Sequence, residues 1–417
     1  DGISDPLVGT WSDKLRTRFG RRHPLMLASV VPLAATFVML FSPPDWVLDD
    51  QGDLFAWLLV SIVLLRTALT VFMVPYLALG AEMSSDYHER TRLASARTNL
   101  GFFIGVLASA LALFFLFGES NGEDGRFVID NYRTYGWINA GLVVVFSAVC
   151  LAGTWRYIPT LLTPPKREGN LLRDLIDAFR NKNFLYIVLF DTALGGMSGI
   201  TATLLMVTYT YFWELDAAQI SLLFAGPVVM AVALLALFSE TMNRLFEKQQ
   251  LLRLSCGVTI INLMWLTPMK LLGWLPENSG WVFTLIFLNW GIHMIMVILR
   301  MISVQAVLAD IVDEQELATG KRQEGVMFAA AFFSAKFISG FGYIVAGPFL
   351  DLIGLEAGMQ PGEAPDRVLW GLGLIMGPGL AAIMVVPLWL SFLLRVSHQS
   401  HVEVRKALTE RHENTTH

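Results

Sequence analysis

Two carboxylates at the start of the chain are the first residues whose type and spacing suggest chemistry. Asp1 and Asp5 are four residues apart with Ser4 between them, so a helix would place all three on one face. Neighbouring carboxylates repel each other unless a cation or a proton lies between them, and hard cations prefer oxygen ligands. Thr70, in a later apolar run, can add a neutral oxygen. The pattern predicts a cation site at Asp1, Ser4, Asp5 and Thr70, with helix capping as the alternative role of the acids.

The composition places these acids in apolar surroundings. Of 417 residues, 54% are hydrophobic and 16% are charged, with a mean hydropathy of +0.55, whereas soluble domains carry about 25% charged residues. The chain is therefore predicted to be a membrane protein. Cys150 and Cys256 both lie in apolar runs, and we expect free thiols there rather than a disulfide or a zinc site.

Apolar runs long enough to cross a bilayer follow the opening segment. A spanning helix needs about 20 apolar residues, and we predict spans at 24–43, 54–82, 94–117, 135–158, 183–212, 217–243, 251–271, 280–308, 323–353 and 369–394. The fold class is an all-α membrane protein. We expect two six-helix bundles in which helix I and the outer half of helix II are missing from this chain.

The 30 Lys and Arg residues fall mainly in alternate connections, and the positive-inside rule makes that side cytoplasmic. We expect an N-terminal bundle at 1–158 with helices II–VI and a C-terminal bundle at 183–394 with helices VII–XII. Residues 159–182 are predicted to form a central cytoplasmic loop with an amphipathic helix, and 395–417 a cytoplasmic tail. A weak repeat supports two halves, because the spans ending near 82 and 308 close on Leu79-Gly80-Ala81-Glu82 and Val307-Leu308-Ala309-Asp310.

Four more charges lie well away from the ends of predicted spans, and an ionised side chain costs about 2.5–3.5 kcal/mol at the bilayer centre. Lys336 is near mid-depth, and we expect it to pair with Asp1 or Asp5, with Asp191 as the competing partner. Arg66 either pairs with an acid of the protein or binds an anionic group of a substrate. Arg300 is expected to extend toward the cytoplasmic surface.

Uncharged polar and aromatic residues complete the candidates. Asn289 and His293 share a span and can face a cavity, although a packed, hydrogen-bonded imidazole is the alternative. Tryptophans near span ends are expected to be interfacial anchors; these are Trp46, Trp57, Trp137, Trp213 and Trp274.

Three stretches resemble one family, the glycoside-pentoside-hexuronide:cation symporters, or melibiose permease group, of the major facilitator superfamily. The first is similar to its helix II and helix II–III loop signature and runs Asp1-Gly2-Ile3-Ser4-Asp5-Pro6-Leu7-Val8-Gly9, followed by Ser12-Asp13-Lys14 and Arg18-Phe19-Gly20-Arg21-Arg22. The others are Val74-Pro75-Tyr76-Leu77-Ala78-Leu79-Gly80-Ala81-Glu82 with Arg90 and Arg97, and Ala309-Asp310-Ile311-Val312-Asp313 with Glu316, Arg322 and Lys336. The resemblance covers essentially the whole chain.

The resemblance implies roles for matching residues. Asp1, Ser4, Asp5 and Thr70 match the cation site of the family, and Ser4 stands where melibiose permease has asparagine, which leaves sodium or proton as the coupling ion. Lys336 matches the helix XI lysine that interacts with the acidic cluster. A cytoplasmic gate is implied at Asp13, Arg21, Arg22, Arg90, Asp310, Asp313, Glu316 and Arg322.

The chain departs from melibiose permease at the residues that would hold a galactosyl ring. Met73 and Leu77 replace an acid and a tryptophan, and Arg66 is additional. The candidates for the substrate cavity are Arg66, Met73, Leu77, Arg97, Asp191, Asn289 and His293. The substrate is expected to be a sugar, glycoside or uronide, with an amphipathic or lysolipid-like anion as the alternative.

The expected function is cation-coupled secondary active symport by alternating access, in a bacterial inner (plasma) membrane with the C-terminus cytoplasmic. A sensor or scaffold that has lost transport is a further alternative. An enzyme is not expected, because the sequence has no HExxH, no GxSxG and no metal-spaced Cys or His set. We expect no cofactor beyond sodium or a proton, contacts with a small-molecule substrate and with membrane lipid, no nucleic-acid partner and a monomer.

Overall fold

The computed structural model describes residues 4–15, 17–83, 87–120, 123–160, 171–276, 280–320, 324–356, 358–396, 403–404, 406–408 and 410. The only strands among these residues are β1 (Glu119–Ser120) and β2 (Glu123–Asp124), which form a two-residue antiparallel pair. The helices separate into two compact units, Asp1–Arg167 and Glu168–His417. The boundary lies inside the interval 159–182, which was predicted to connect two bundles.

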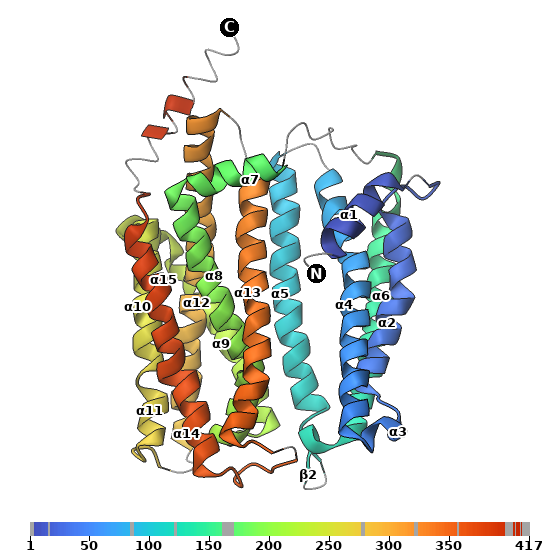
Figure 1. The fold of residues 1–417 in the computed structure, drawn as a ribbon, viewed down its shortest axis with the longest axis vertical. Coiled ribbons are helices and arrows are strands. Elements are labelled where there is room, and N and C mark those ends of the chain that lie inside the picture. The colour runs from blue at the N-terminus through green and yellow to red at the C-terminus, as the bar shows by residue number, and fades with distance from the viewer. Residues whose placement is uncertain are drawn as a thin grey trace. The chain divides into compact units, whose positions relative to one another are not determined.

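The N-terminal unit is built around α2, which packs against α4 and α6, while α1 packs against α4 (Figure 1). The Asp50 side chain sets the start of α4 by accepting hydrogen bonds from the backbone N–H groups of Gly52 and Asp53. The helices are α1 (Ser4–Lys14), α2 (His23–Phe41), α3 (Asp45–Leu48), α4 (Gln51–Glu82), α5 (Tyr87–Phe115) and α6 (Ile129–Trp155), with 3₁₀ turns at Gly125–Phe127 and Ile158–Thr160.

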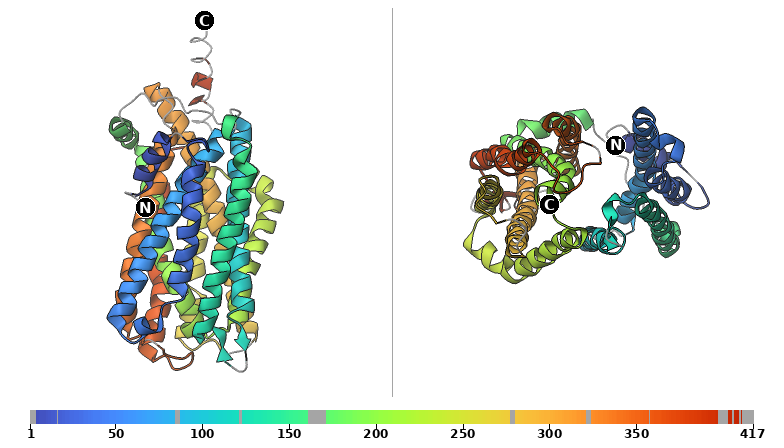
Figure 2. Two further views of the ribbon diagram at one scale, coloured as in Figure 1. Left: turned by 90° about the vertical axis from the view of Figure 1, so that its right-hand side faces the viewer. Right: turned by 90° about the horizontal axis from the view of Figure 1, so that it is seen from below.

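The C-terminal unit packs α8 against α13 and α15, and α12 against α9 and α10. The end-on view in Figure 2 shows α15 (red) beside α10 (yellow). Its helices are α7 (Leu171–Arg180), α8 (Lys182–Val207), α9 (Ala217–Leu245), α10 (Lys248–Leu263), α11 (Leu266–Leu271), α12 (Gly280–Thr319), α13 (Glu324–Ile353), α14 (Asp366–Leu374) and α15 (Leu380–Leu393). Two π-helical turns, η3 (Thr208–Phe212) and η4 (Ile375–Gly379), follow α8 and α14.

Several predicted spans differ from the structure, and the span 183–212 ends in η3. The span 251–271 is broken between α10 and α11, and the span 369–394 contains η4 with Pro378 inside it. The helix predicted to end at 308 continues to Thr319. Its buried face repeats at helical spacing beyond the apolar run, through Ile311, Val312 and Gln315, so the helix continues where hydropathy falls.

Nine helices among the described residues are long and apolar enough to cross a membrane. The predicted span 94–117 corresponds to α5, whose apolar part, Phe103–Phe115, is shorter. Large apolar side chains are widely exposed, for example Phe55 at 67% and Ile261 at 70%, as expected where lipid replaces water as the solvent. The protein is an integral multi-pass membrane protein.

Backbone contact between α8 and α13 depends on glycine. A Cβ atom at Gly195 would overlap the carbonyl oxygen of Ala335, and one at Gly199 would overlap that of Ser339. Gly342 faces Gly199 from α13, and a Cβ atom there would lie 2.7 Å from the Gly199 carbonyl carbon. Small residues allow such close helix packing in membranes, where van der Waals contact supplies much of the attraction.

Gly199→Ala is expected to destabilise the protein by about 1–3 kcal/mol, because the added methyl group forces α8 away from α13. Thermal unfolding of the full protein in detergent measures this. Gly257→Ala in α10 is the control, since a Cβ atom there has no neighbour within 4 Å. Equal unfolding temperatures for the two variants would show that the close approach is not needed.

Candidate cation and substrate sites

Two neutral oxygens of the predicted cation site lie together in the N-terminal unit. The packing of α1 on α4 places Ser4 Oγ 3.5 Å from Thr70 Oγ1, and Thr70 is buried. Asp5 follows Ser4 in α1, but its side chain and the whole of Asp1 lie outside the described residues. Two hydroxyl ligands therefore meet beside the backbone position of one predicted carboxylate.

A buried ion pair joins the start of α2 to the end of α4. Arg22 donates to Glu82 Oε1 from Nε at 3.0 Å and from Nη2 at 2.6 Å. Arg22 Nη1 also donates to Ser12 Oγ at 2.7 Å, and Arg21 Nη2 lies 3.0 Å from Glu82 Oε2. The predicted gate residues Arg21 and Arg22 thus share one acid, Glu82. Glu82 was absent from the predicted gate, although the repeat 79–82 ends on it.

The C-terminal unit contains the corresponding pair. Lys248 Nζ, at the start of α10, lies 2.8 and 2.7 Å from the two carboxylate oxygens of Asp310, which belongs to α12. Asp310 occupies the same place in its repeat segment as Glu82 does in the first. Each repeat acid therefore pairs with a cation at the start of a neighbouring helix. Lys248 was not among the predicted gate residues.

The end of α12 is also tied to α7 and α8. Gln315 Nε2 donates to the Asp177 carbonyl oxygen at 3.3 Å, and Asn183 Nδ2 donates to Glu314 Oε2 at 3.0 Å. Asp313 and the buried Glu316 lie on this same extension of α12. Of the other predicted gate residues, Arg322 and the side chains of Asp13 and Arg90 lie outside the described residues.

The substrate candidates divide between the units. Arg66, Met73 and Leu77 lie on α4, and Arg97 lies on α5 with its guanidinium carbon 5.8 Å from the Tyr76 ring centre. None of these four lines either of the pockets described next. Asp191, Asn289 and His293 belong to the C-terminal unit and line its pockets.

The larger pocket, with about 460 Å³ of open space, lies among α8, α12 and α13. Arg300 and Asp191 line it. Arg300 is 6% exposed and its Nη1 donates to Thr259 Oγ1 at 3.3 Å. The prediction that Arg300 extends to the cytoplasmic surface is wrong, because the helix continues well beyond it and neighbouring side chains enclose it. The rest of the lining is mainly apolar, with Leu, Met, Val and Ala side chains.

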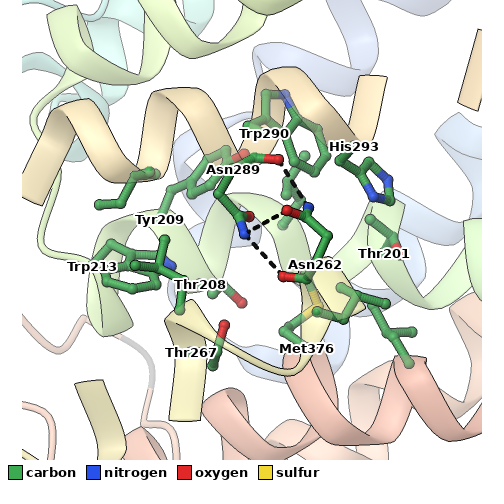
Figure 3. A pocket seen from close by; sticks show the side chains of 15 residues that line it. Thr201, Thr208, Tyr209, Trp213, Asn262, Thr267, Asn289, Trp290, His293 and Met376 are labelled. Carbon is green, nitrogen blue, oxygen red and sulfur yellow. Dashed lines mark hydrogen bonds between the residues drawn. The ribbon is translucent and has the colours of Figure 1, made fainter. Parts of the chain in front are cut away.

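The smaller pocket, with about 60 Å³ of open space, lies between α8, α10, α12 and η4 (Figure 3). Asn262 and Asn289 fix one wall, since each side-chain amide donates to the backbone carbonyl oxygen of the other at 2.9 Å. Trp290 stacks on His293 with 4.9 Å between ring centres. Trp213, predicted to be an interfacial anchor, is instead 7% exposed and lines this pocket. Because Trp213 is close to the end of a predicted span, the sequence alone did not indicate that it lines a pocket.

Trp290, His293 and Thr201 line both pockets and form their shared wall. Lys336 lies on α13, and its pairing with Asp1 or Asp5 stays a prediction. Among the described residues, no group of three or more His, Cys, Asp or Glu side chains is arranged to hold a metal ion.

Comparison with known proteins finds relatives that are all named as transporters or symporters. A family model described as MFS/sugar transport protein matches residues 1–398. An uncharacterised symporter of Synechocystis is 25% identical, covering 99% of this chain and 88% of the relative. A putative glycoside/cation symporter of Escherichia coli is 25% identical (87% and 75%). An isoprimeverose transporter of Lactiplantibacillus pentosus is 22% identical (93% and 78%).

Glu82→Ala is expected to destabilise the protein by about 3–5 kcal/mol, because it leaves the buried Arg22 guanidinium without its carboxylate. Asp45→Ala is the control: the Asp45–Arg133 pair is exposed, and its loss is expected to cost less than about 1 kcal/mol. Unfolding in detergent measures both variants. A Glu82→Ala effect no larger than that of Asp45→Ala would contradict a structural role for the buried pair.

Proposed function

The chain belongs to the MFS/sugar transport protein family, and on that premise we propose that it is a cation-coupled symporter for a sugar, glycoside or uronide, working by alternating access. The main support for cation coupling is that the hydroxyl groups of Ser4 and Thr70 lie close together, next to Asp5 in α1. Oxygen atoms at such a point suit a hard cation such as sodium. Two of the relatives are named symporters, which supports this function.

Coupling requires that cation and substrate together favour the occluded state more than either does alone. A ligand shifts a conformational equilibrium only by its difference in affinity between the states. In the proposed cycle, a sodium ion or a proton at Asp1 and Asp5 takes the place of the Lys336 ammonium group. The ion pairs at Glu82 and Asp310 are proposed to break and re-form as part of the cytoplasmic gate.

The larger pocket is the proposed C-terminal part of the substrate site. Arg300 can present N–H groups to the carboxylate of a uronide, because a guanidinium matches a carboxylate in shape and charge. The same pocket supports a second candidate substrate, an amphipathic anion, since most of its lining is apolar around one buried cation. We further propose a bacterial inner membrane, a cytoplasmic C-terminus, a monomer and no cofactor beyond the coupling ion.

Thr70→Val is expected to raise the cation concentration for half-maximal uptake by about tenfold, because it removes one oxygen ligand while keeping the side-chain volume nearly unchanged. Uptake into vesicles containing the full-length protein, with sodium and pH varied separately, measures this. Thr67→Val is the matched control, since Thr67 lies on the same helix with an exposed side chain bonded to the Val63 carbonyl oxygen.

Asp5→Asn tests the same site through its charge and is expected to abolish cation-dependent uptake. If Asp5→Asn and Thr70→Val both retain the cation dependence of the unaltered protein, the cation site is placed wrongly. Dependence on pH alone, lost in Asp5→Asn, would identify a proton as the coupling ion.

Arg300→Gln is expected to weaken binding of D-glucuronate by about tenfold or more, because a hydrogen bond to a charged group is lost, while binding of D-glucose is unchanged. Arg66→Gln is the comparison, since Arg66 is the other cation predicted to meet an anion. Ligand-induced stabilisation of the detergent-purified protein measures both. Loss of glucuronate binding in Arg66→Gln but not in Arg300→Gln would reject the larger pocket, and stabilisation by lysophosphatidylcholine alone would favour the amphipathic anion.

A further inference from the structure

The larger pocket contains one acid that the proposed transport cycle does not use. Asp191 is the only Asp or Glu among its fifteen lining residues. Within the described part of the chain, no residue forms a hydrogen bond or a direct ion pair with the Asp191 carboxylate. An ionised carboxylate in apolar surroundings is costly unless it is paired, and a proton removes that cost. Asp191 is therefore placed to exchange a proton.

Arg300 supplies the opposite charge. It is the only Arg or Lys of the lining, and a guanidinium stays protonated in proteins. Its Nη1 donates to Thr259 Oγ1 at 3.3 Å, and the Thr259 hydroxyl group donates its own hydrogen to the Ser255 carbonyl oxygen at 2.7 Å. The threonine therefore orients the guanidinium without neutralising it. With Asp191 ionised, the pocket carries one positive and one negative charge and is neutral.

His293 is the remaining lining residue that titrates near neutral pH. It lies on α12 with Arg300, is 7% exposed and stacks on Trp290 with 4.9 Å between ring centres. A second positive charge in the pocket of the guanidinium is disfavoured by repulsion. We therefore expect His293 to stay neutral.

Among the described residues, the helices packed on α8 add no second acid to the lining of the pocket. α13 contributes Ala335, and the next residue, Lys336, is exposed. α15 packs on α8 and has no charged residue between Leu380 and Leu393. α7 and η3 adjoin the two ends of α8, whereas Asp191 lies in its interior. The charge balance of the pocket therefore depends on Asp191, on the guanidinium and on the ligand that enters.

An anion at Arg300 upsets that balance. The ligand places a second negative charge in the pocket with Asp191, and two carboxylates that share a site do not readily both stay ionised. Charges interact more strongly in apolar surroundings than in water, because the effective dielectric constant is lower. A proton on Asp191 removes the repulsion and leaves the guanidinium and the ligand as the single pair of opposite charges.

We propose that Asp191 takes up a proton from solution when an anion binds at Arg300, so that anion and proton enter the pocket together. The proton bonds to one carboxylate oxygen of Asp191 and is released when the anion leaves. This proposal rests on the proposed anion site, and it adds a proton that is distinct from the coupling ion at Asp1 and Asp5. Each transported anion is thus accompanied by one proton bound within the C-terminal unit.

Isothermal titration of the full-length protein in detergent tests the proposal without a cation gradient. The probes are D-glucuronate and octanoate, a hydrophilic and an amphipathic anion. Titration in two buffers with different ionisation enthalpies counts the protons, and uptake of about one proton per bound anion is expected near neutral pH. The affinity for either anion is expected to fall as pH rises, by at most about tenfold per pH unit, because the anion-bound protein carries the proton.

Asp191→Asn is the deciding variant, because an amide resembles a protonated carboxyl group in shape and carries no charge. It is expected to bind both anions without proton uptake and with an affinity that does not change with pH. Above neutral pH it is expected to bind them more tightly than the unaltered protein does. A gain in affinity of this kind cannot come from a damaged pocket.

Two further variants separate Asp191 from other titrating groups. Asp366→Asn removes an exposed carboxylate at the start of α14 in the same unit, and it is expected to show the proton uptake of the unaltered protein. His293→Gln removes the imidazole of the pocket, and it is expected to retain proton uptake as well.

Anion binding without proton uptake overturns this proposal and leaves the proposed anion site standing. Proton uptake that persists in Asp191→Asn also overturns it, and its loss in His293→Gln would then place the proton on the imidazole. If neither anion binds to the unaltered protein, the anion site itself is rejected and this proposal fails with it. Cation-dependent uptake, measured with Thr70→Val, is a separate result that none of these outcomes changes.

Discussion

The cost of an unpaired charge in apolar surroundings governs how this chain is arranged. Arg22 and Glu82 are both buried, and the guanidinium makes two hydrogen bonds to one carboxylate oxygen. Such a pair needs good geometry and further hydrogen bonds to offset the loss of water, and Ser12 supplies one of them. The start of α10 also carries a cation paired with an acid of a neighbouring helix, Lys248 with Asp310 of α12, although the Lys248 side chain is half exposed. In each unit, an acid of the repeat segment thus pairs with a cation at the start of a neighbouring helix.

Hydropathy, charge distribution and three short motifs are enough to predict the all-α membrane fold and the family, and both are confirmed. The repeat 79–82 and 307–310 also pointed to Glu82 and Asp310 before their partners were known. Hydropathy does not reveal where a helix ends when its last turns are polar on one side only. The predicted span therefore stopped at 308, although α12 continues to Thr319. Hydropathy also cannot detect the break after α10, because Met264 and Trp265 are as apolar as their neighbours.

The errors within the candidate site have a shared physical cause. Depth along a span says nothing about which neighbouring helix a side chain meets. Arg300 and Trp213 were both assigned from distance to a span end, and both are buried by residues far away in the sequence, such as Thr259 for Arg300. Asp191, Asn289 and His293 line pockets, whereas the roles predicted for Asp1, Asp5 and Lys336 stay predictions.

The unbroken length of α12 has a mechanical consequence. From His293 in the shared wall to Asp310 at the charged end, the helix continues without interruption, and these positions are about 25 Å apart along its axis. A rigid helix that tilts about one point moves its distant residues farther than its near ones. A tilt of about 5° pivoting near the pocket would displace Asp310 by about 2 Å over that rise, and the Lys248 side chain would have to change conformation to keep its 2.7 Å contact.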